Sequence, residues 1–283
     1  MVKRSSATGW AGLVMVVAAA LMILMPSSAM AAQVSCGATI VQDTRLDQDL
    51  DCPDTAVRIG ADGVTLDLAG HEITGHGEGV GVLNVKGQDF VLERGRIAGF
   101  DAGALLGELT ATGPSGANGY RVERMAFEDN NAAGLGALGN DGVVSRVITT
   151  GNGGIGASLI GSRNHVERVT ATGNGIEGIR LTLAFGVPAV DNVIERNVVE
   201  RSGSDGIFVA ADRTLVARND SDHNAGNGIA FQQPSDGSVV TRNSADENQG
   251  HGIEGVPGIV DGGRNHAQGN ALSPQCVEVV CSP

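Results

Sequence analysis

The middle of the chain alternates between apolar and polar residues in short runs, and each run follows a glycine. Residues 179–181, 207–209 and 229–231 read Ile-Arg-Leu, Ile-Phe-Val and Ile-Ala-Phe. A period of two residues is the pattern of a β-strand that buries one face. The repeats do not have the 3.6-residue period of an amphipathic helix, so we expect an all-β structure.

Three markers recur along the chain and divide it into units of 20–31 residues. A glycine followed by an apolar residue begins one strand of each unit, at Gly79, Gly103, Gly134, Gly154, Gly178, Gly206, Gly228 and Gly252. An aliphatic-x-Arg step marks a second strand, with its arginine at Arg94, Arg124, Arg146, Arg168, Arg196, Arg218 and Arg242. A short polar residue four positions before the glycine suits a tight corner, at Asn130, Thr150, Asn174, Ser202, Asn224 and Asn248. Three short strands and three corners fit one coil of a three-sided parallel β-helix, and we predict about eight to nine coils.

Residues 64–75, Val-Thr-Leu-Asp-Leu-Ala-Gly-His-Glu-Ile-Thr-Gly, and the Asn-x-x-x-Gly-Ile coils resemble a known family. They are similar to the right-handed parallel β-helix repeat proteins of the pectate-lyase-like superfamily. The resemblance covers about residues 60–270 and implies a right-handed solenoid in an exported bacterial protein. It implies no single activity, because this superfamily includes polysaccharide lyases, hydrolases, epimerases and adhesins.

The four cysteines lie near the two ends of the predicted solenoid, at Cys36 and Cys52 and at Cys276 and Cys281. Coils stack at about 4.8 Å, so seven intervals separate the ends by at least about 34 Å. A disulfide needs Cα atoms within about 7 Å. We therefore expect the pairs Cys36–Cys52 and Cys276–Cys281, each of which would staple an end that is otherwise an open sheet edge.

The first 31 residues have the features of a signal peptide. Lys3 and Arg4 precede an apolar run over residues 11–25, and Ala29-Met30-Ala31 offers a cleavage site. We expect an N-terminal cap and first coil over residues 32–60, the β-helix over 61–270 and a C-terminal tail with a disulfide over 271–283. The predicted location is secreted or periplasmic, and no second apolar stretch predicts a membrane span.

The charge of the chain disfavours two classes of partner. The net charge is −13, and the chain contains only two lysines. A nucleic-acid binder needs a basic surface that releases counterions, and an anionic lipid surface attracts basic segments. We expect neither partner.

Polar residues stand just before the repeated glycines, at Glu78, Glu177, Asp205, Asn227 and His251. The last four belong to consecutive coils, so stacking places Glu177 and Asp205 about 5 Å apart at Cα. Two carboxylates that close raise the proton affinity of one of them, which suits an acid/base pair or a Ca²⁺ site. Arg180 and Phe208 project beside them.

From this column we select two sets of candidate residues. The candidate catalytic residues are Glu177, Asp205 and Arg180. The candidate ligand-binding residues are Arg180, Asp205, Phe208, Asn227 and His251. The alternative is that Asp-Gly and Asn-Gly serve only as corner residues. We predict no cofactor, and Ca²⁺ is the one ion that the carboxylate pair would suit.

Two further features have competing interpretations. Glutamates precede four of the repeated arginines, so we expect a neutralised solvated surface there rather than a cationic stripe. Two coils are lengthened over residues 107–119 and 184–190. These loops could wall a shallow groove lined by Asn140, Asp141, Arg163 and His165, or they could be insertions that the solenoid tolerates.

Two functional hypotheses follow. The Asn-Thr-Asp, Asp-Asp and Arg-Ile-Lys motifs of polygalacturonases and the Asp-Pro-His motif of alginate epimerases are missing. We therefore predict a non-catalytic extracellular binding or surface-structural protein, with a polysaccharide as the expected partner. The alternative is a polysaccharide-modifying enzyme, similar to the uronate lyases that the resemblance includes.

Overall fold

The computed structural model describes residues 34–283 except 86, 111–112 and 185. The predicted signal peptide lies outside the described residues. The described part of the chain consists of β-strands and connecting turns, without a helix. It therefore contains no helix with the length and hydrophobicity that a membrane crossing requires.

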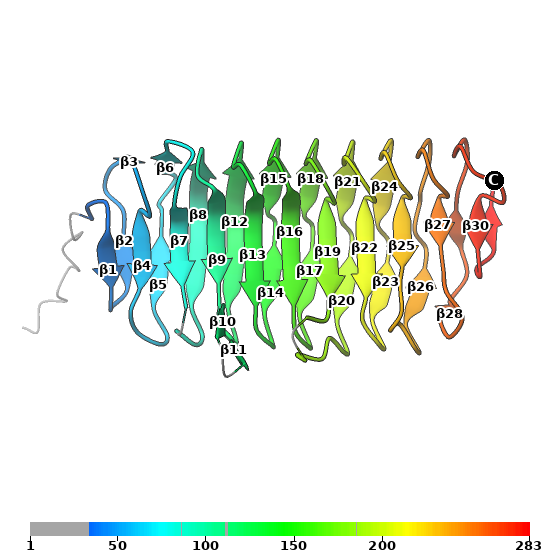
Figure 1. Cartoon of the computed structure of the whole chain (residues 1–283), viewed down its shortest axis with the longest axis horizontal. Coiled ribbons are helices and arrows are strands. Elements are labelled where there is room, and N and C mark those ends of the chain that lie inside the picture. Colours follow the sequence, from blue (N-terminus) through cyan, green and yellow to red (C-terminus); the bar gives the residue numbers. More distant parts are fainter. Residues whose placement is uncertain (1–33, 86, 111–112, 185) are drawn as a thin grey trace, which may run out of the picture. The chain divides into compact units, whose positions relative to one another are not determined.

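Successive strands wind into coils with three faces, which we name A, B and C (Figure 1). Face A is an 11-stranded parallel sheet made of β1 (Ala38–Ile40), β4 (Val57–Ile59), β7 (Val80–Asn84), β9 (Ala102–Leu106), β13 (Ala133–Leu138), β16 (Ile155–Ile160), β19 (Ile179–Thr182), β22 (Ile207–Ala210), β25 (Ile229–Phe231), β27 (Ile253–Glu254) and β30 (Cys276–Val277).

Faces B and C are joined into one 16-stranded sheet by β8 (Val91–Ala98) and β12 (Arg121–Glu128), which run along both faces. Face B also contains β2 (Thr44–Arg45), β5 (Thr65–Asp67), β14 (Val143–Ser145), β17 (His165–Glu167), β20 (Val193–Glu195), β23 (Leu215–Ala217), β26 (Val239–Thr241) and β28 (Val260–Asp261). Face C also contains β3 (Leu50–Cys52), β6 (Glu72–Gly75), β15 (Ile148–Thr150), β18 (Thr170–Thr172), β21 (Val198–Glu200) and β24 (Asp220–Asp222). A separate pair, β29 (Asn265–His266) and β31 (Cys281–Ser282), continues face C through bridges at Ser244.

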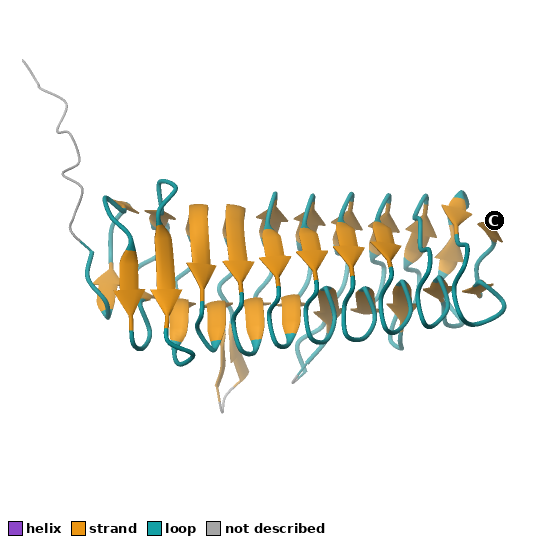
Figure 2. Cartoon of the chain, turned by 90° about the horizontal axis from the view of Figure 1, so that it is seen from above, coloured by secondary structure: helices purple, strands orange, loops and turns teal. Residues whose placement is uncertain are grey.

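We number the coils by their face A strands, so that coil 1 begins with β1, coil 5 with β13, coil 7 with β19 and coil 10 with β27. The predicted all-β, right-handed parallel β-helix is confirmed, with about ten coils rather than eight to nine. A short antiparallel hairpin of β10 (Glu108–Thr110) and β11 (Gly113–Ser115) leaves the A–B corner of coil 4 (Figure 2).

Inward residues stack in rows that form the core. One row on face A runs Val82, Ala104, Leu135, Ala157, Ile179, Ile207, Ile229 and Ile253, and all eight are fully buried. Full burial of one such aliphatic side chain contributes about 1.5–3 kcal/mol. The alternation seen in the sequence therefore corresponds to an inward apolar row and outward variable positions.

Strand pairing corrects the predicted register in two coils. Ala157 pairs with both Leu135 and Ile179, so Gly156 and not Gly154 stacks with Gly134 and Gly178. In coil 3, Val82 pairs with Ala104, which makes Gly81 the repeated glycine instead of Gly79. The corrected glycines are 22, 31, 22, 22, 28, 22 and 24 residues apart, so the two large values mark the two inserted loops.

The predicted corner residues form a buried ladder of side-chain amides. Asn152, and not Thr150, occupies this corner in coil 6, while Thr150 lies on β15. Each asparagine Nδ2 donates to the Oδ1 of the next one at 2.9 Å in the pairs Asn130–Asn152, Asn152–Asn174, Asn224–Asn248 and Asn248–Asn270. Ser202 interrupts this ladder between Asn174 and Asn224, and its buried hydroxyl has no hydrogen-bond partner.

The arginine column forms the B–C corner. The seven predicted arginines and Arg264 have φ between 53° and 62°, in the left-handed region. Four of their side chains pair with neighbouring carboxylates, those of Arg94, Arg168, Arg196 and Arg218, for example Arg168 with Glu167 at 3.3 Å and Arg196 with Glu195 at 2.8 Å. These pairs agree with a neutralised surface rather than a cationic stripe.

Both predicted disulfides are confirmed. The Cα atoms are 5.5 Å apart in Cys36–Cys52 and 6.1 Å apart in Cys276–Cys281. Each bond lies near one end of the solenoid, where the last strands have no further coil to pair with. Disulfides persist in oxidising compartments, so they are compatible with an extracellular or periplasmic protein.

Candidate functional site

A group of polar side chains covers the outward side of face A in coils 7–10. We call it the polar patch, and it comprises Glu177, Arg180, Asp205, Phe208, Asn227, His251 and Glu254. Four of these residues immediately precede the repeated glycine of their coil, and three lie two positions after it. Because outward residues of neighbouring strands stand about 4.8 Å apart, the register brings these side chains into contact.

Glu177 and Arg180 form the first part of the patch. Arg180 Nη2 donates to Glu177 Oε1 at 2.6 Å, and the Glu177 side chain is only 6% exposed. The Arg180 guanidinium carbon lies 5.8 Å from the centre of the Phe208 ring, within the range of a cation–π contact. Glu177 Oε2 and Arg180 Nε are buried and have no hydrogen-bond partner in the structure. A ligand would therefore meet this pair through the Arg180 side chain, which is 33% exposed, and not through these two covered atoms.

Asn227 links the second part of the patch. Its backbone N–H and its Nδ2 donate to Asp205 Oδ1 at 2.7 and 3.1 Å. Nδ2 also donates to Glu254 Oε2 at 2.8 Å, and Asn227 Oδ1 accepts from the backbone N–H of His251 at 2.7 Å. One amide thus fixes residues of three successive coils.

Asp205 has an altered proton affinity. Burial raises the pKa of Asp205, and the negative charges of Glu177 and Glu254 raise it further, while the hydrogen bonds from Asn227 lower it in part. Asp205 therefore keeps a proton to higher pH than an ordinary aspartate does. This is the behaviour that a general acid requires.

The structure brings together most of the residues that the sequence selected. Arg180 contacts Glu177 and Phe208, and Asn227 contacts Asp205 on the neighbouring coil. His251 contributes its backbone N–H, whereas its imidazole Nδ1 lies 2.7 Å from the Pro274 carbonyl oxygen.

Two residues differ from the predicted column. Glu78 does not belong to it, because the corrected register of coil 3 places Val80 there. Glu254 belongs to the patch and was not predicted. The sequence Gly252-Ile253-Glu254 has the same order as Gly178-Ile179-Arg180, so Glu254 holds the position that Arg180 holds in its coil.

One other cluster has ligand atoms that a metal ion could use. Among the described residues, the one group of three such side chains is His165, Glu167 and Glu195 on face B, with ligand atoms within 4.8 Å of one another. Glu195 also pairs with Arg196 at 2.8 Å and with Arg218 at 3.4 Å, so its charge is already balanced. The Ca²⁺ site expected at Glu177 and Asp205 stays a prediction.

The two lengthened coils border a small hollow at the A–B corner. It has a volume of about 100 Å³, and its lining includes Asn118 from the first loop, Asn140 from a compact coil and Val187 from the second loop. Of the four residues predicted to line a groove here, Asn140 does so. Asp141 and Arg163 instead form a two-bond ion pair at 2.7 and 2.8 Å, and His165 lies on face B.

Comparisons with known proteins agree with the architecture. A family model described as "Right handed beta helix region" matches residues 114–219. No curated protein matches the chain. The A-module of mannuronan C-5 epimerase AlgE4 from Azotobacter vinelandii is similar in structure, with 12% sequence identity and a TM-score of 0.60, over 89% of this chain and 88% of that chain.

Two further solved structures are similar to this chain to different degrees. Pectate lyase Pel9A is 15% identical, with a TM-score of 0.55 over 90% of this chain and 71% of that chain. The Dettilon tailspike protein is 14% identical, with a TM-score of 0.49 over 83% of this chain, which spans 59% of the tailspike chain. At these identities the likeness concerns the fold alone. The chain therefore has a right-handed parallel β-helix fold, which the AlgE4 A-module and pectate lyase Pel9A share.

Proposed function

We propose that this protein is an exported carbohydrate-binding protein and that its polysaccharide ligand lies on the polar patch, across β19, β22, β25 and β27. The observation that carries the proposal is the stack of hydrogen-bonding side chains at outward positions of four consecutive coils. The repeat of about 4.8 Å is close to the length of one sugar in an extended chain. A polymer of sugars can therefore meet a similar position at each coil.

The patch is preorganised for binding. Asn227 is held by Asp205 and Glu254, and Arg180 is held by Glu177, so these side chains lose little freedom when a ligand arrives. The Phe208 ring offers an apolar surface beside them, which suits the C–H face of a sugar. Each carboxylate of the patch already accepts a hydrogen bond from Arg180 or Asn227, so it is less free to transfer a proton to or from a substrate. This arrangement favours binding over catalysis.

The charge of the patch restricts the ligand. Three carboxylates, at Glu177, Asp205 and Glu254, face one guanidinium at Arg180. A polyanionic glycan would be repelled unless a cation bridged it to the protein. We therefore expect a neutral glycan to bind with or without calcium, and a uronate polymer to bind only with calcium.

A carbohydrate microarray probed with residues 32–283, with calcium and with chelator, tests the proposal. Asn227→Ala removes the amide that fixes three coils, and we expect it to weaken binding of any captured glycan about tenfold. Thr170→Ala, which changes an exposed residue of face C, is the matched control and should bind like the wild type. Absence of binding to every glycan, or binding that Asn227→Ala leaves unchanged, would contradict the proposal.

The raised pKa of Asp205 favours one alternative, a polysaccharide-modifying enzyme similar to uronate lyases. In that case the polymer captured on the array would be cleaved, and unsaturated sugar ends would accumulate. Asp205→Asn would then abolish turnover and preserve most of the affinity. An unaltered rate of cleavage in Asp205→Asn would exclude Asp205 as the acid.

A further inference from the structure

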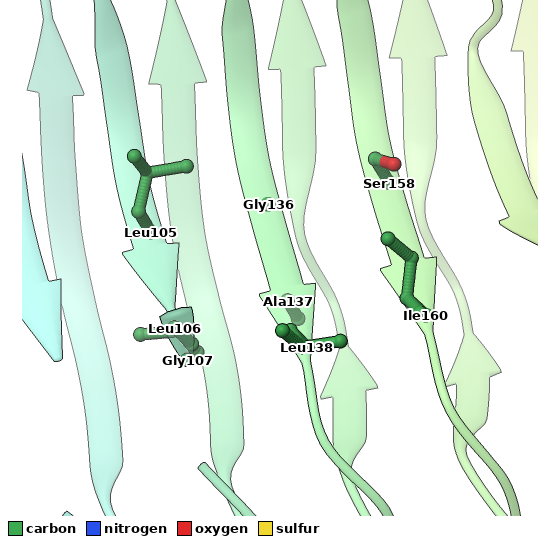
Figure 3. Close-up of a pocket in the computed structure, with 8 residues that line it drawn as sticks. All are labelled: Leu105, Leu106, Gly107, Gly136, Ala137, Leu138, Ser158 and Ile160. Carbon is green, nitrogen blue, oxygen red and sulfur yellow. The ribbon is translucent and has the colours of Figure 1, made fainter. Parts of the chain in front are cut away.

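Face A has an apolar hollow in coils 4–6 (Figure 3). Its volume is about 200 Å³, and its lining residues are Leu105, Leu106, Gly107, Gly136, Ala137, Leu138, Ser158 and Ile160. Leu106, Ala137 and Leu138 are buried, and Ser158 carries the one polar side chain of this lining. The hollow therefore offers a group of carbon atoms on a face that is otherwise exposed to water.

The hollow exists because Gly136 has no side chain. The outward positions that pair with it across face A carry Leu105 on one side and Ser158 on the other. Gly136 is not among the glycines in the left-handed region, so its backbone does not require glycine. A Cβ built on Gly136 would lie 2.8 Å from Leu105 Cδ2 and would project into the hollow. A larger residue at this position would occupy part of the hollow.

The hollow and the polar patch belong to one row. Strand pairing joins Gly136 to Ser158, Ser158 to Arg180 and Arg180 to Phe208. Two strand spacings, about 10 Å, therefore separate Gly136 from Arg180. A chain of sugars that occupies the patch and extends toward coil 5 passes over the hollow.

We propose that the hollow binds a short acyl substituent of the glycan whose sugars occupy the polar patch. The proposal rests on the proposed function, which it deepens by naming the ligand class as an O-acylated glycan. An ester joins an alkyl group to a carbonyl acceptor, and the Ser158 hydroxyl stands between the apolar walls and Arg180 to donate to it. Apolar cavities near this size accept a benzene-sized group, so an acyl chain of about four to six carbons fits.

Methyl NMR spectra of leucine- and isoleucine-labelled protein test the hollow with methyl 6-O-hexanoyl-glucoside, which carries the ester, with methyl glucoside, and with n-hexyl glucoside, which has an alkyl chain without the carbonyl. We expect the hexanoyl ester to shift the methyl signals of Leu105, Leu138 and Ile160, methyl glucoside to leave them in place, and hexyl glucoside to bind more weakly than the ester. Gly136→Val should weaken binding of the ester at least tenfold, while Thr170→Val on face C, which places the same side chain elsewhere, should not change it. Unmoved methyl signals, equal binding by Gly136→Val, or equal binding of hexyl glucoside would overturn the proposal.

The test separates failure of the hollow from failure of the proposed function. Gly136→Val alters the hollow and leaves the side chains of the polar patch in place, so it should leave array binding of glycans without acyl groups unchanged. If the array shows no glycan while the hexanoyl ester still binds, the proposed function fails and the hollow remains a site for the acyl group alone, so the link to a glycan is overturned.

Discussion

The two halves of face A share one backbone and differ in their outward residues. In coils 3–6 the central outward column reads Leu83, Leu105, Gly136 and Ser158. In coils 7–10 the same column reads Arg180, Phe208, Ala230 and Glu254. The column just before the glycines changes likewise, from Val80, Ala102, Ala133 and Ile155 to Glu177, Asp205, Asn227 and His251.

The inward side does not change between the halves. The same buried row of aliphatic and alanine residues continues from Val82 to Ile253. The comparison teaches that the inward positions determine the fold, whereas the outward positions are free to carry an apolar surface in one half and a polar one in the other. Three substitution experiments test this separation, in order of decreasing expected effect.

A buried charge should have the largest effect, and it should be similar in both halves. Leu135→Asp and Ile207→Asp each place a carboxylate in the core row, where a buried unpaired charge costs several kcal/mol. We expect each variant to lose most of its cooperative unfolding transition in thermal or chemical denaturation. Phe208→Asp, at the adjacent outward position, is the control and should unfold like the wild type. A large loss in only one half would show that the two cores are not equivalent.

The amide ladder should show the next largest effect. Asn152 lies in the first half and donates to the Phe127 carbonyl and to Asn174 Oδ1. Asn248 lies in the second half and donates to the Ser221 carbonyl and to Asn270 Oδ1. Alanine at either position leaves buried partners without hydrogen bonds, so we expect a loss of about 2–4 kcal/mol in the free energy of unfolding, measured by chemical denaturation.

Ser202 provides the control for the ladder, because its hydroxyl already has no partner. Ser202→Ala should change the free energy of unfolding by less than about 0.5 kcal/mol. If Asn152→Ala and Asn248→Ala were as mild as Ser202→Ala, the ladder would not contribute to stability.

The smallest effect concerns face C, where the halves differ in charge. Thr150 and Thr172 are followed in the same column by Glu200 and Asp222. The pKa of Asp222 is raised to about 6, chiefly because the carboxyl group is partly buried. The hydrogen bond from the Asp246 backbone N–H lowers this pKa in part, whereas the hydrogen bond with Asp220 and the charges of Asp220 and Asp246 raise it further. The folded state thus binds this proton more tightly than the unfolded chain, so the contribution to stability is present below about pH 4 and is lost as the pH rises through about 6.

Asp222→Asn keeps the acceptor for the Asp246 N–H and removes the charge. We expect it to raise the free energy of unfolding by about 1 kcal/mol near pH 7.5, after allowance for solvent screening, and to change little near pH 4. Chemical denaturation at both pH values measures the difference. Thr172→Asn, in the other half, should show no such dependence on pH, and an equal shift at both pH values for Asp222→Asn would refute the assignment.

Most of the polar patch could be predicted because its residues hold the same position relative to clear glycine repeats. Glu177, Asp205 and Asn227 each precede a glycine that begins an unambiguous apolar-x-apolar run, and His251 precedes the glycine of Gly252-Ile253. Glu254 was missed because Gly255 follows it where Leu181, Val209 and Phe231 complete the apolar-x-apolar run of the other coils, so only the Gly-Ile-x part of the pattern was present. The hollow was missed because it depends on a glycine at an outward position, and the sequence does not tell an outward glycine from one at a turn.

The sequence by itself determined the coil order, the inward apolar alternation, the three-sided parallel β-helix and both disulfide pairs. Only the tertiary structure decided the register in coils 3 and 6. Residues 79–82 and 153–157 each contain two glycine–apolar steps two residues apart, and a slip of two residues keeps every side chain on its own face. Local alternation cannot distinguish such registers. Pairing with the neighbouring coils does, because it alone aligns Gly156 with Gly134 and Gly178 and brings Asn152 into the ladder.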